Sequence, residues 1–275
     1  MAVGWNSLDA NTSGNNNTAV GSQSLSGNTS GASNTAVGKN ALRANQTGND
    51  NVAVGQQALE DNTASGNTAL GYAALLENTS GSSNTAVGKG ALDANTTASN
   101  NTAVGKDAGS SNTTGTQNTF VGRAAGQNNT TGAYQAVLGD GALETNTTGL
   151  SNTAIGQYAL RLNTTASNNT AVGYQAGNSN TTGANNSFIG YAVGYANTTG
   201  TENVGVGGQG ASSNTTLRFN TTGSNNTAIG ISALQANTTA SNNTAVGYQA
   251  MYSNTTAQSN VAVGRTAMYL SLIHI

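Results

Sequence analysis

The most unusual column of side chains in this chain is an asparagine that lies seven residues after a repeating glycine. Every member except Asn62 is followed two positions later by Ser or Thr, the acceptor pattern for N-linked glycosylation. The candidate acceptors are Asn11, Asn28, Asn45, Asn78, Asn95, Asn112, Asn129, Asn146, Asn163, Asn180, Asn197, Asn214, Asn220, Asn237 and Asn254. One interpretation is a glycan on each repeat along one edge. The alternative is an unmodified ladder of amides that hydrogen-bond along the axis, which the close spacing of stacked strands favours.

Other chemistry has little support in the sequence. The ten Asp and Glu residues occupy unrelated repeat positions, there is no cysteine, and the single histidine, His274, lies in an atypical terminal segment. No glycine-rich loop matches a phosphate or calcium motif. The sequence therefore predicts no enzyme, no metal site and no cofactor. A net charge of −2 with 7% charged residues argues against nucleic-acid binding, and no apolar run is long enough to span a membrane.

The asparagines must be positioned by a repeated element, because the glycine of Ala-Val-Gly returns about every seventeen residues, with one step of sixteen from Gly55 to Gly71. Such a period predicts an all-β, parallel β-solenoid of about sixteen rungs, formed by residues 1–269 as a single body. One step, from Gly207 to Gly230, is six residues longer, and we place this insertion near 215–220, around Leu217 and Phe219. Residues 270–275 leave the repeat and match the translation of a common sequencing adapter, so we interpret them as an artefact; the alternative is an apolar tail packed on the last rung.

Each rung contains one short strand, of which Asn-Thr-Ala-Val-Gly is typical. The residue before the glycine is always Val, Ile or Leu, so we predict that Val20, Val37 and their equivalents point inward, together with the Thr two positions earlier. The residue between them varies from Gly to Phe, a range that a narrow interior should not accommodate. We therefore predict that this column faces outward.

Each rung offers a core of only one Val, one Leu and small Ala and Thr surfaces, which is too thin to offset the cost of ordering about seventeen residues. This thin core and the outward column together predict association of the chain with copies of itself, as a homotrimer or a longer fibre. The association residues would be Phe120, Phe188 and Val137. The residue after the glycine is often long or aromatic, as in Lys89 and Tyr174, and forms either a contact stripe for carbohydrate, protein or a host surface, or a solvated edge.

Segments such as 169–176 (Asn-Thr-Ala-Val-Gly-Tyr-Gln-Ala) and 226–230 (Asn-Thr-Ala-Ile-Gly) resemble the head repeats of trimeric autotransporter adhesins. They resemble even more the related repeats of phage tail fibres and large bacterial surface proteins. The resemblance covers residues 2–269, although the seventeen-residue period is longer than the usual rung of the adhesins. It implies a left-handed parallel β-roll, three chains side by side, and a role in projection or adhesion.

These observations predict a structural or adhesive shaft of an extracellular fibre or surface appendage, with N-glycosylation along one edge as an open question. The alternative is a phage tail-fibre shaft without glycans on the virion surface. An ice-binding solenoid is less favoured, because it needs an exposed flat array of threonines, and we expect the threonines in turns or beneath the surface.

Overall fold

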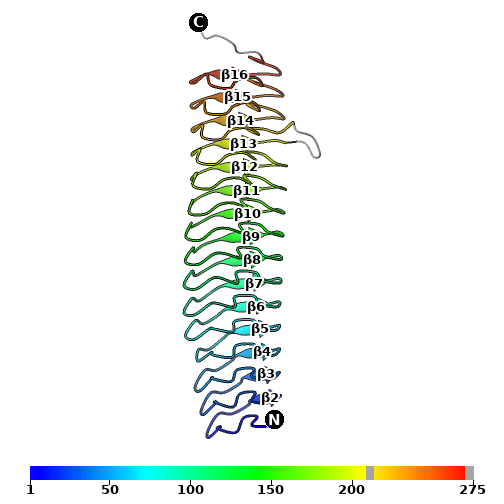
Figure 1. Ribbon diagram of the computed structural model, residues 1–275, viewed down its shortest axis with the longest axis vertical. Coiled ribbons are helices and arrows are strands. Elements are labelled where there is room, and N and C mark those ends of the chain that lie inside the picture. The colour runs from blue at the N-terminus through cyan, green and yellow to red at the C-terminus, as the bar shows by residue number, and fades with distance from the viewer. Residues whose placement is uncertain (209–213, 270–275) are drawn as a thin grey trace. The chain divides into compact units, whose positions relative to one another are not determined.

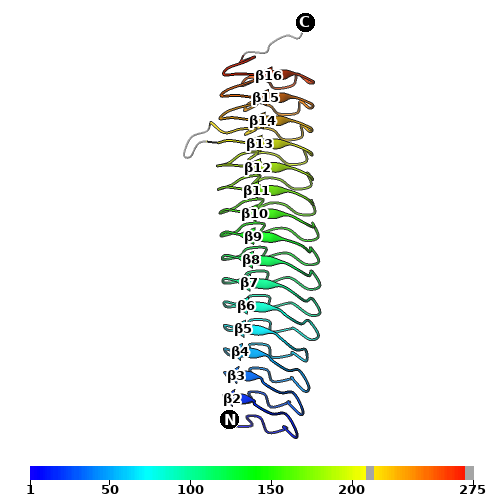
Figure 2. The ribbon, with the colours of Figure 1, turned by 180° about the vertical axis from the view of Figure 1, so that it is seen from behind.

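The computed structural model describes residues 1–208 and 214–269 of the chain. They divide into two compact units at residues 134/135, the second comprising the described residues 135–208 and 214–269, and each unit is a stack of eight short strands joined by turns, without a helix among the described residues (Figures 1 and 2). The strands of the first unit are β1 (Ala2–Val3), β2 (Thr18–Val20), β3 (Thr35–Val37), β4 (Val52–Val54), β5 (Thr68–Leu70), β6 (Thr85–Val87), β7 (Thr102–Val104) and β8 (Thr119–Val121). Those of the second are β9 (Ala136–Leu138), β10 (Thr153–Ile155), β11 (Thr170–Val172), β12 (Ser187–Ile189), β13 (Val204–Val206), β14 (Thr227–Ile229), β15 (Thr244–Val246) and β16 (Val261–Val263).

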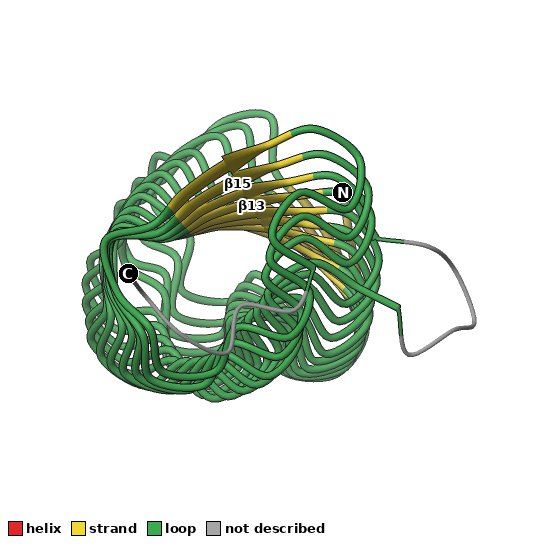
Figure 3. Cartoon of the chain, turned by 90° about the horizontal axis from the view of Figure 1, so that it is seen from above, coloured by secondary structure: helices red, strands yellow, loops and turns green. Residues whose placement is uncertain are grey.

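Within each unit every strand pairs in parallel with the next strand along the chain. Thr18 pairs with Thr35 in the first unit and Thr153 with Thr170 in the second, one period apart. Seen down the stack, the strands lie along one side of the coil and turns complete the rest of each rung (Figure 3). The prediction of an all-β parallel solenoid of about sixteen rungs is confirmed. Its description as a single body over residues 1–269 stays a prediction.

The direction in which the strand side chains point is the reverse of the prediction. The middle residue of the strand is buried: Ala19, Phe120, Val137 and Phe188 are all at most 2% exposed. The residue before the glycine instead points outward, as Leu70 at 49% and Leu138 at 51% exposure show. The predicted inward positions of Val20, Val37, Val54 and Leu70 are therefore wrong, and the same alternation turns the strand threonines outward.

The other half of the core is a column of leucines four residues after the glycine. Leu42, Leu92 and Leu160 are fully buried and have φ angles of 52°, 51° and 48°. This left-handed conformation is uncommon for a residue with a side chain and costs about 1 kcal/mol or more at each position. It persists because the turn then directs the isobutyl group into the interior, against the middle residues of the strands.

The wide range of residue sizes in the middle column is compensated inside the core. Where the strand carries Phe188, the two nearest leucine positions are Gly177 and Gly194. A Cβ atom on Gly177 would lie 2.9 Å from Phe188 Cδ2, and one on Gly194 would lie 2.5 Å from Phe188 Cδ1. Phe120 stands in the same relation to Gly109 and Gly126. One benzyl group therefore fills the space of two leucines, which is how a narrow interior accommodates phenylalanine.

The six extra residues lie earlier than predicted. Val204 of β13 pairs with Thr227 of β14, so the insertion falls between these strands. Leu217 is buried and donates its backbone N–H to Ala233 O at 3.1 Å, the bond that Leu234 makes to Ala250 O. Leu217 is thus the core leucine of its rung, and the additional residues precede Thr216 instead of occupying 215–220. Residues 270–275, including His274, lie outside the described residues.

Candidate functional site

The asparagines seven residues after the glycine form a buried ladder. Asn180 donates Nδ2–H to Asn163 Oδ1 at 2.9 Å and to Gly183 O at 2.9 Å, and its own Oδ1 accepts from Asn197 Nδ2 at 2.8 Å. All three asparagines have no exposed surface. The same pair of donations recurs in both units, so the amide of each rung closes its own turn and joins it to the preceding rung.

Of the two interpretations that the sequence left open, these contacts argue against a glycan on each asparagine in the folded chain. Nδ2 is the atom that would carry the sugar, and in the ladder it is enclosed and already makes two hydrogen bonds. Across the insertion the ladder runs from Asn197 to Asn220 at 2.9 Å, so Asn214 is not a member. At the first rung Asn11 is partly exposed, yet its Nδ2 still donates to Gly14 O at 3.0 Å. The alternative of a ladder of stacked amides is what the structure shows.

A second ladder precedes the strands, and the sequence reasoning missed it. Asn186 is fully buried: its backbone N–H donates to Asn169 Oδ1 at 2.9 Å and its Nδ2 donates to Gly200 O at 2.9 Å. The signal was present in the sequence, because Asn stands immediately before the strand in nearly every rung. Gln135 takes one such place, where it bonds Gly149 O and accepts from the N–H of Asn152 at 3.0 Å.

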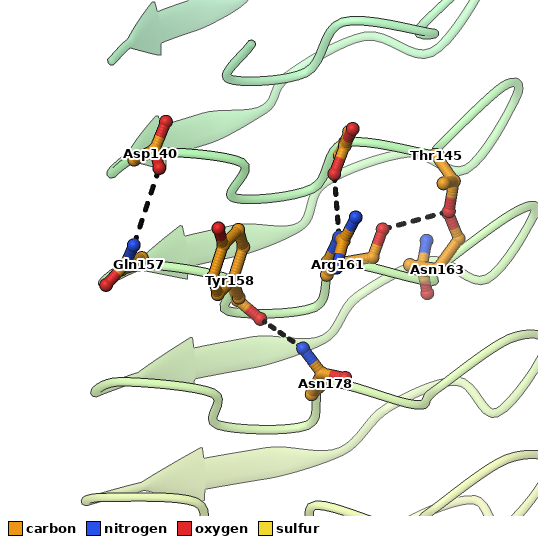
Figure 4. A network of polar contacts seen from close by, with 8 residues as sticks. Asp140, Thr145, Gln157, Tyr158, Arg161, Asn163 and Asn178 are labelled. Carbon is orange, nitrogen blue, oxygen red and sulfur yellow. Dashed lines mark hydrogen bonds and ion pairs between the residues drawn. The ribbon is translucent and has the colours of Figure 1, made fainter. Parts of the chain in front are cut away.

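Polar side chains on the turn surface also connect consecutive rungs (Figure 4). Arg161 Nε donates to Glu144 Oε2 at 2.7 Å, and Asn178 Nδ2 donates to Tyr158 O at 3.1 Å. On the equivalent surface of the first unit, burial raises the pKa of Asp93, with smaller contributions from the nearby Glu77 and Asp107 carboxylates. These contacts serve the stacking of rungs and do not converge on a reaction centre.

The surface that remains for interaction is the outer face, which we define as the strand positions three and one before the glycine together with the position one after it. Its central column is aliphatic in every rung and exposed in many, with Leu70 at 49%, Leu138 at 51% and Ile189 at 42%. The column before it is mainly threonine. Since single exposed aliphatic residues are normal but a continuous stripe is not, this face is the candidate interaction surface.

Long and aromatic side chains form the third column of the outer face, at the position after the glycine. Lys89 Nζ lies 5.6 Å from the centre of the Tyr72 ring, and Arg265 lies 5.7 Å from that of Tyr248. The rings of Tyr174 and Tyr191 stack at 5.1 Å. This column is thus an ordered margin of the face, available for contacts.

Phe120, Phe188 and Val137 do not belong to the outer face. They point into the coil of their own rung, so their assignment as association residues is wrong. The sequence does carry a sign of this burial: each Phe occurs together with glycines at the two nearest leucine positions. This pairing shows that the Phe ring and the leucine positions share one enclosed space. The outer aliphatic column takes the place of these residues as the surface for association.

Neither a pocket nor a cluster of potential metal ligands occurs within residues 1–208 and 214–269. The described part of the chain also contains no helix with the length and hydropathy needed to cross a membrane. No family model, curated protein or solved structure matches this chain. The outer face is therefore the one feature of the described residues that we take as the candidate functional site.

Proposed function

We propose that this chain is a structural or adhesive shaft of an extracellular fibre or surface appendage. The observation that carries the proposal is the aliphatic stripe that runs along the outer face within each unit, on a repeat in which no pocket occurs among the described residues. A solenoid whose rungs repeat the same hydrogen bonds provides length and stiffness, and its surface provides lateral contacts. Localisation outside the cell rests on the resemblance to adhesin and tail-fibre repeats.

Self-association through the outer face follows from its chemistry. Burial of the central column against a second sheet would remove aliphatic side chains such as Ile155 and Ile189 from water, at about 25 cal/mol per Å². Two sheets can pack face to face about 10 Å apart without any change in the coil. The partner is then another copy of the chain, in a dimer, a trimer or a fibre.

Light scattering coupled to size-exclusion chromatography, with electron microscopy of the same sample, tests this function. We expect a concentration-dependent oligomer of elongated particles, which the substitution Ile189→Lys weakens. The matched control is Thr182→Lys, also an exposed position but outside the outer face, which should leave the oligomer unchanged. A well-folded monomer at high micromolar concentration, with both variants alike, would refute association through this face.

The outward threonines give a second candidate function, an ice-binding face. In the described residues the hydroxyls of strand threonines such as Thr153 and Thr170 make no protein hydrogen bond, whereas Thr181 in the turn donates to Thr198 O at 3.0 Å. Free hydroxyls beside methyl-bearing side chains on a regular sheet could order water. Measurement of thermal hysteresis separates the candidates, since a shaft gives none and an ice-binding face loses its activity in Thr170→Tyr.

A further inference from the structure

The second unit separates the polar side chains of each Asn-Thr-Thr motif that begins at a member of the buried asparagine ladder. In the turn before β12, Asn180 has no exposed surface, whereas Thr182, two residues later, is exposed. Each equivalent turn of this unit places an exposed threonine at the same position. These residues, which we call the hydroxyl column, are Thr148, Thr165, Thr182 and Thr199 before the insertion and Thr222, Thr239 and Thr256 after it.

The fold uses the backbone of the hydroxyl column but not its hydroxyl groups. The preceding threonines are engaged: Thr164 Oγ1 donates to Thr181 O at 3.1 Å, and Thr181 Oγ1 donates to Thr198 O at 3.0 Å. Thr182 donates only its backbone N–H, to Thr198 O at 3.2 Å, and within the described residues its Oγ1 has no hydrogen-bond partner. Because any residue except proline can supply that N–H, the stacking of rungs does not account for a threonine in each of these turns.

The surroundings of the hydroxyl column are small and uncharged. Thr182 is followed by the buried Gly183 and the half-buried Ala184, so no large side chain stands beside its hydroxyl. The four residues from each column threonine onward include no Lys or Arg in any of the seven turns. A row of phosphates here would lack cationic partners and repel itself. A neutral group such as a sugar needs only the accessible hydroxyl and the open surface.

We propose that the hydroxyl column of the second unit is a site of O-glycosylation, with Thr182 and its equivalents as acceptors. The donor is a nucleoside-diphosphate sugar, and the step is a glycosyl transfer without oxidation or reduction. Thr182 Oγ1 forms a bond to the anomeric carbon while the bond from that carbon to the diphosphate breaks. The nucleoside diphosphate leaves with the bonding electrons, and the hydroxyl proton passes to a base of the transferase.

The spacing of the acceptors limits how many of them carry a sugar. Rungs lie ~4.8 Å apart, so a sugar on one threonine covers the next, and we expect modification of non-adjacent rungs. Attached sugars are bulky and solubilising, and they would keep this edge from packing against another chain. The modification thus goes beyond the proposed shaft function, because it assigns a second surface and holds for a monomer as well as for a fibre.

The site is tested on peptides of native material by electron-transfer fragmentation, which keeps sugars on their side chains. We expect the added mass of a hexose or hexosamine on Thr182 or its equivalents. Thr181 is the matched internal control, since its hydroxyl is engaged, and neither it nor Asn180 should carry a sugar. Unmodified threonines throughout the column, phosphate in place of sugar, or equal amounts of sugar on Thr181 and Thr182 would each overturn the inference.

A second test asks whether the folded chain accepts a sugar at this position, and it uses recombinant chain, which has no natural cysteine. The variants Thr182→Cys and Thr181→Cys are treated with N-iodoacetylglucosamine, from which the thiolate displaces iodide. We expect the folded Thr182→Cys chain to react about fivefold or more faster than folded Thr181→Cys, and both to react alike in urea.

The coupled Thr182→Cys chain should keep the melting temperature of the uncoupled variant. Its folded rate should also approach its own rate in urea, a comparison that holds even if Thr181→Cys does not fold. Strong protection of the folded Thr182→Cys chain, or loss of the fold on coupling, would overturn the inference. Neither result changes the oligomeric state expected from the outer face, so the shaft function stands or fails by its own test.

Discussion

Replacement of Phe188 by alanine tests the inverted core most directly. The ring is fully buried, and removal of such a ring from a packed interior costs about 3–5 kcal/mol. In the parent chain, Phe188, Val193 and Gly205 supply about ten side-chain carbons, whereas alanine at 188 with leucines at 177 and 194 and the same Val193 and Gly205 would supply about twelve. The space of one phenylalanine should therefore accept two leucines.

The substitutions Gly177→Leu and Gly194→Leu, added to the Phe188→Ala chain, should restore part of the stability that the chain loses with the ring. The two glycines have φ angles of 58° and 63°, close to the 48° of the buried Leu160, so the backbone already has the conformation that the leucine column uses. Burial of two leucines returns about 3–6 kcal/mol, reduced by about 1–2 kcal/mol of left-handed strain at each position. We expect the triple variant to be more stable than Phe188→Ala and somewhat less stable than the parent.

The decisive result is a change in the sign of the two leucines' effect on the free energy of unfolding. The same two leucines must destabilise the chain that retains Phe188, because their Cβ atoms would lie within 3 Å of its ring, and must stabilise the chain that lacks it. Urea unfolding followed by circular dichroism gives the four free energies of unfolding, and hydrogen exchange at β12 reports the local effect if the repeat does not unfold in two states. If the leucines have the same effect in both backgrounds, the ring does not share the interior with these positions.

Four further outcomes follow from the ladders, the glycines and the buried carboxylate. Asn180→Ala should cost about 3 kcal/mol or more in chemical unfolding, because it leaves buried partners in two neighbouring rungs unpaired. Intact-mass spectrometry of native material should detect no glycan on this asparagine, and a hexosamine there would contradict the buried ladder. Gly156→Ala should cost more than ~3 kcal/mol, since φ is 127° and the added Cβ would lie 2.5 Å from Gly173 O, whereas Gly66→Ala, 3.9 Å from its nearest neighbour, should cost only about 1 kcal/mol. The raised pKa of Asp93 means that its stabilising contribution is present below pH 3.8 and is lost as the pH rises, so Asp93→Asn should melt above the parent at pH 7 by a margin that shrinks towards pH 4.

The repeat itself could be predicted from the sequence because stacking demands it. A glycine such as Gly156 recurs where the backbone of the next rung leaves no room for a side chain, so the period, the strand positions and the parallel register are all visible in the order of residues. The low content of charged residues and the lack of a recurring reactive side chain likewise limit the chemistry that the amino-acid sequence can support.

The tertiary structure decided which side of each strand is enclosed. A three-residue strand such as Thr170–Val172 has too few residues for hydrophobic alternation to distinguish its two faces, because alanine, threonine and valine all tolerate partial burial. The decision depends on Leu160 and its equivalents, whose left-handed backbone turns them towards the middle residue and creates a core on that side alone. The same enclosure buries the asparagine amides that resemble glycan acceptors in the sequence. It leaves the aliphatic column outside, where only contact with another surface can remove it from water.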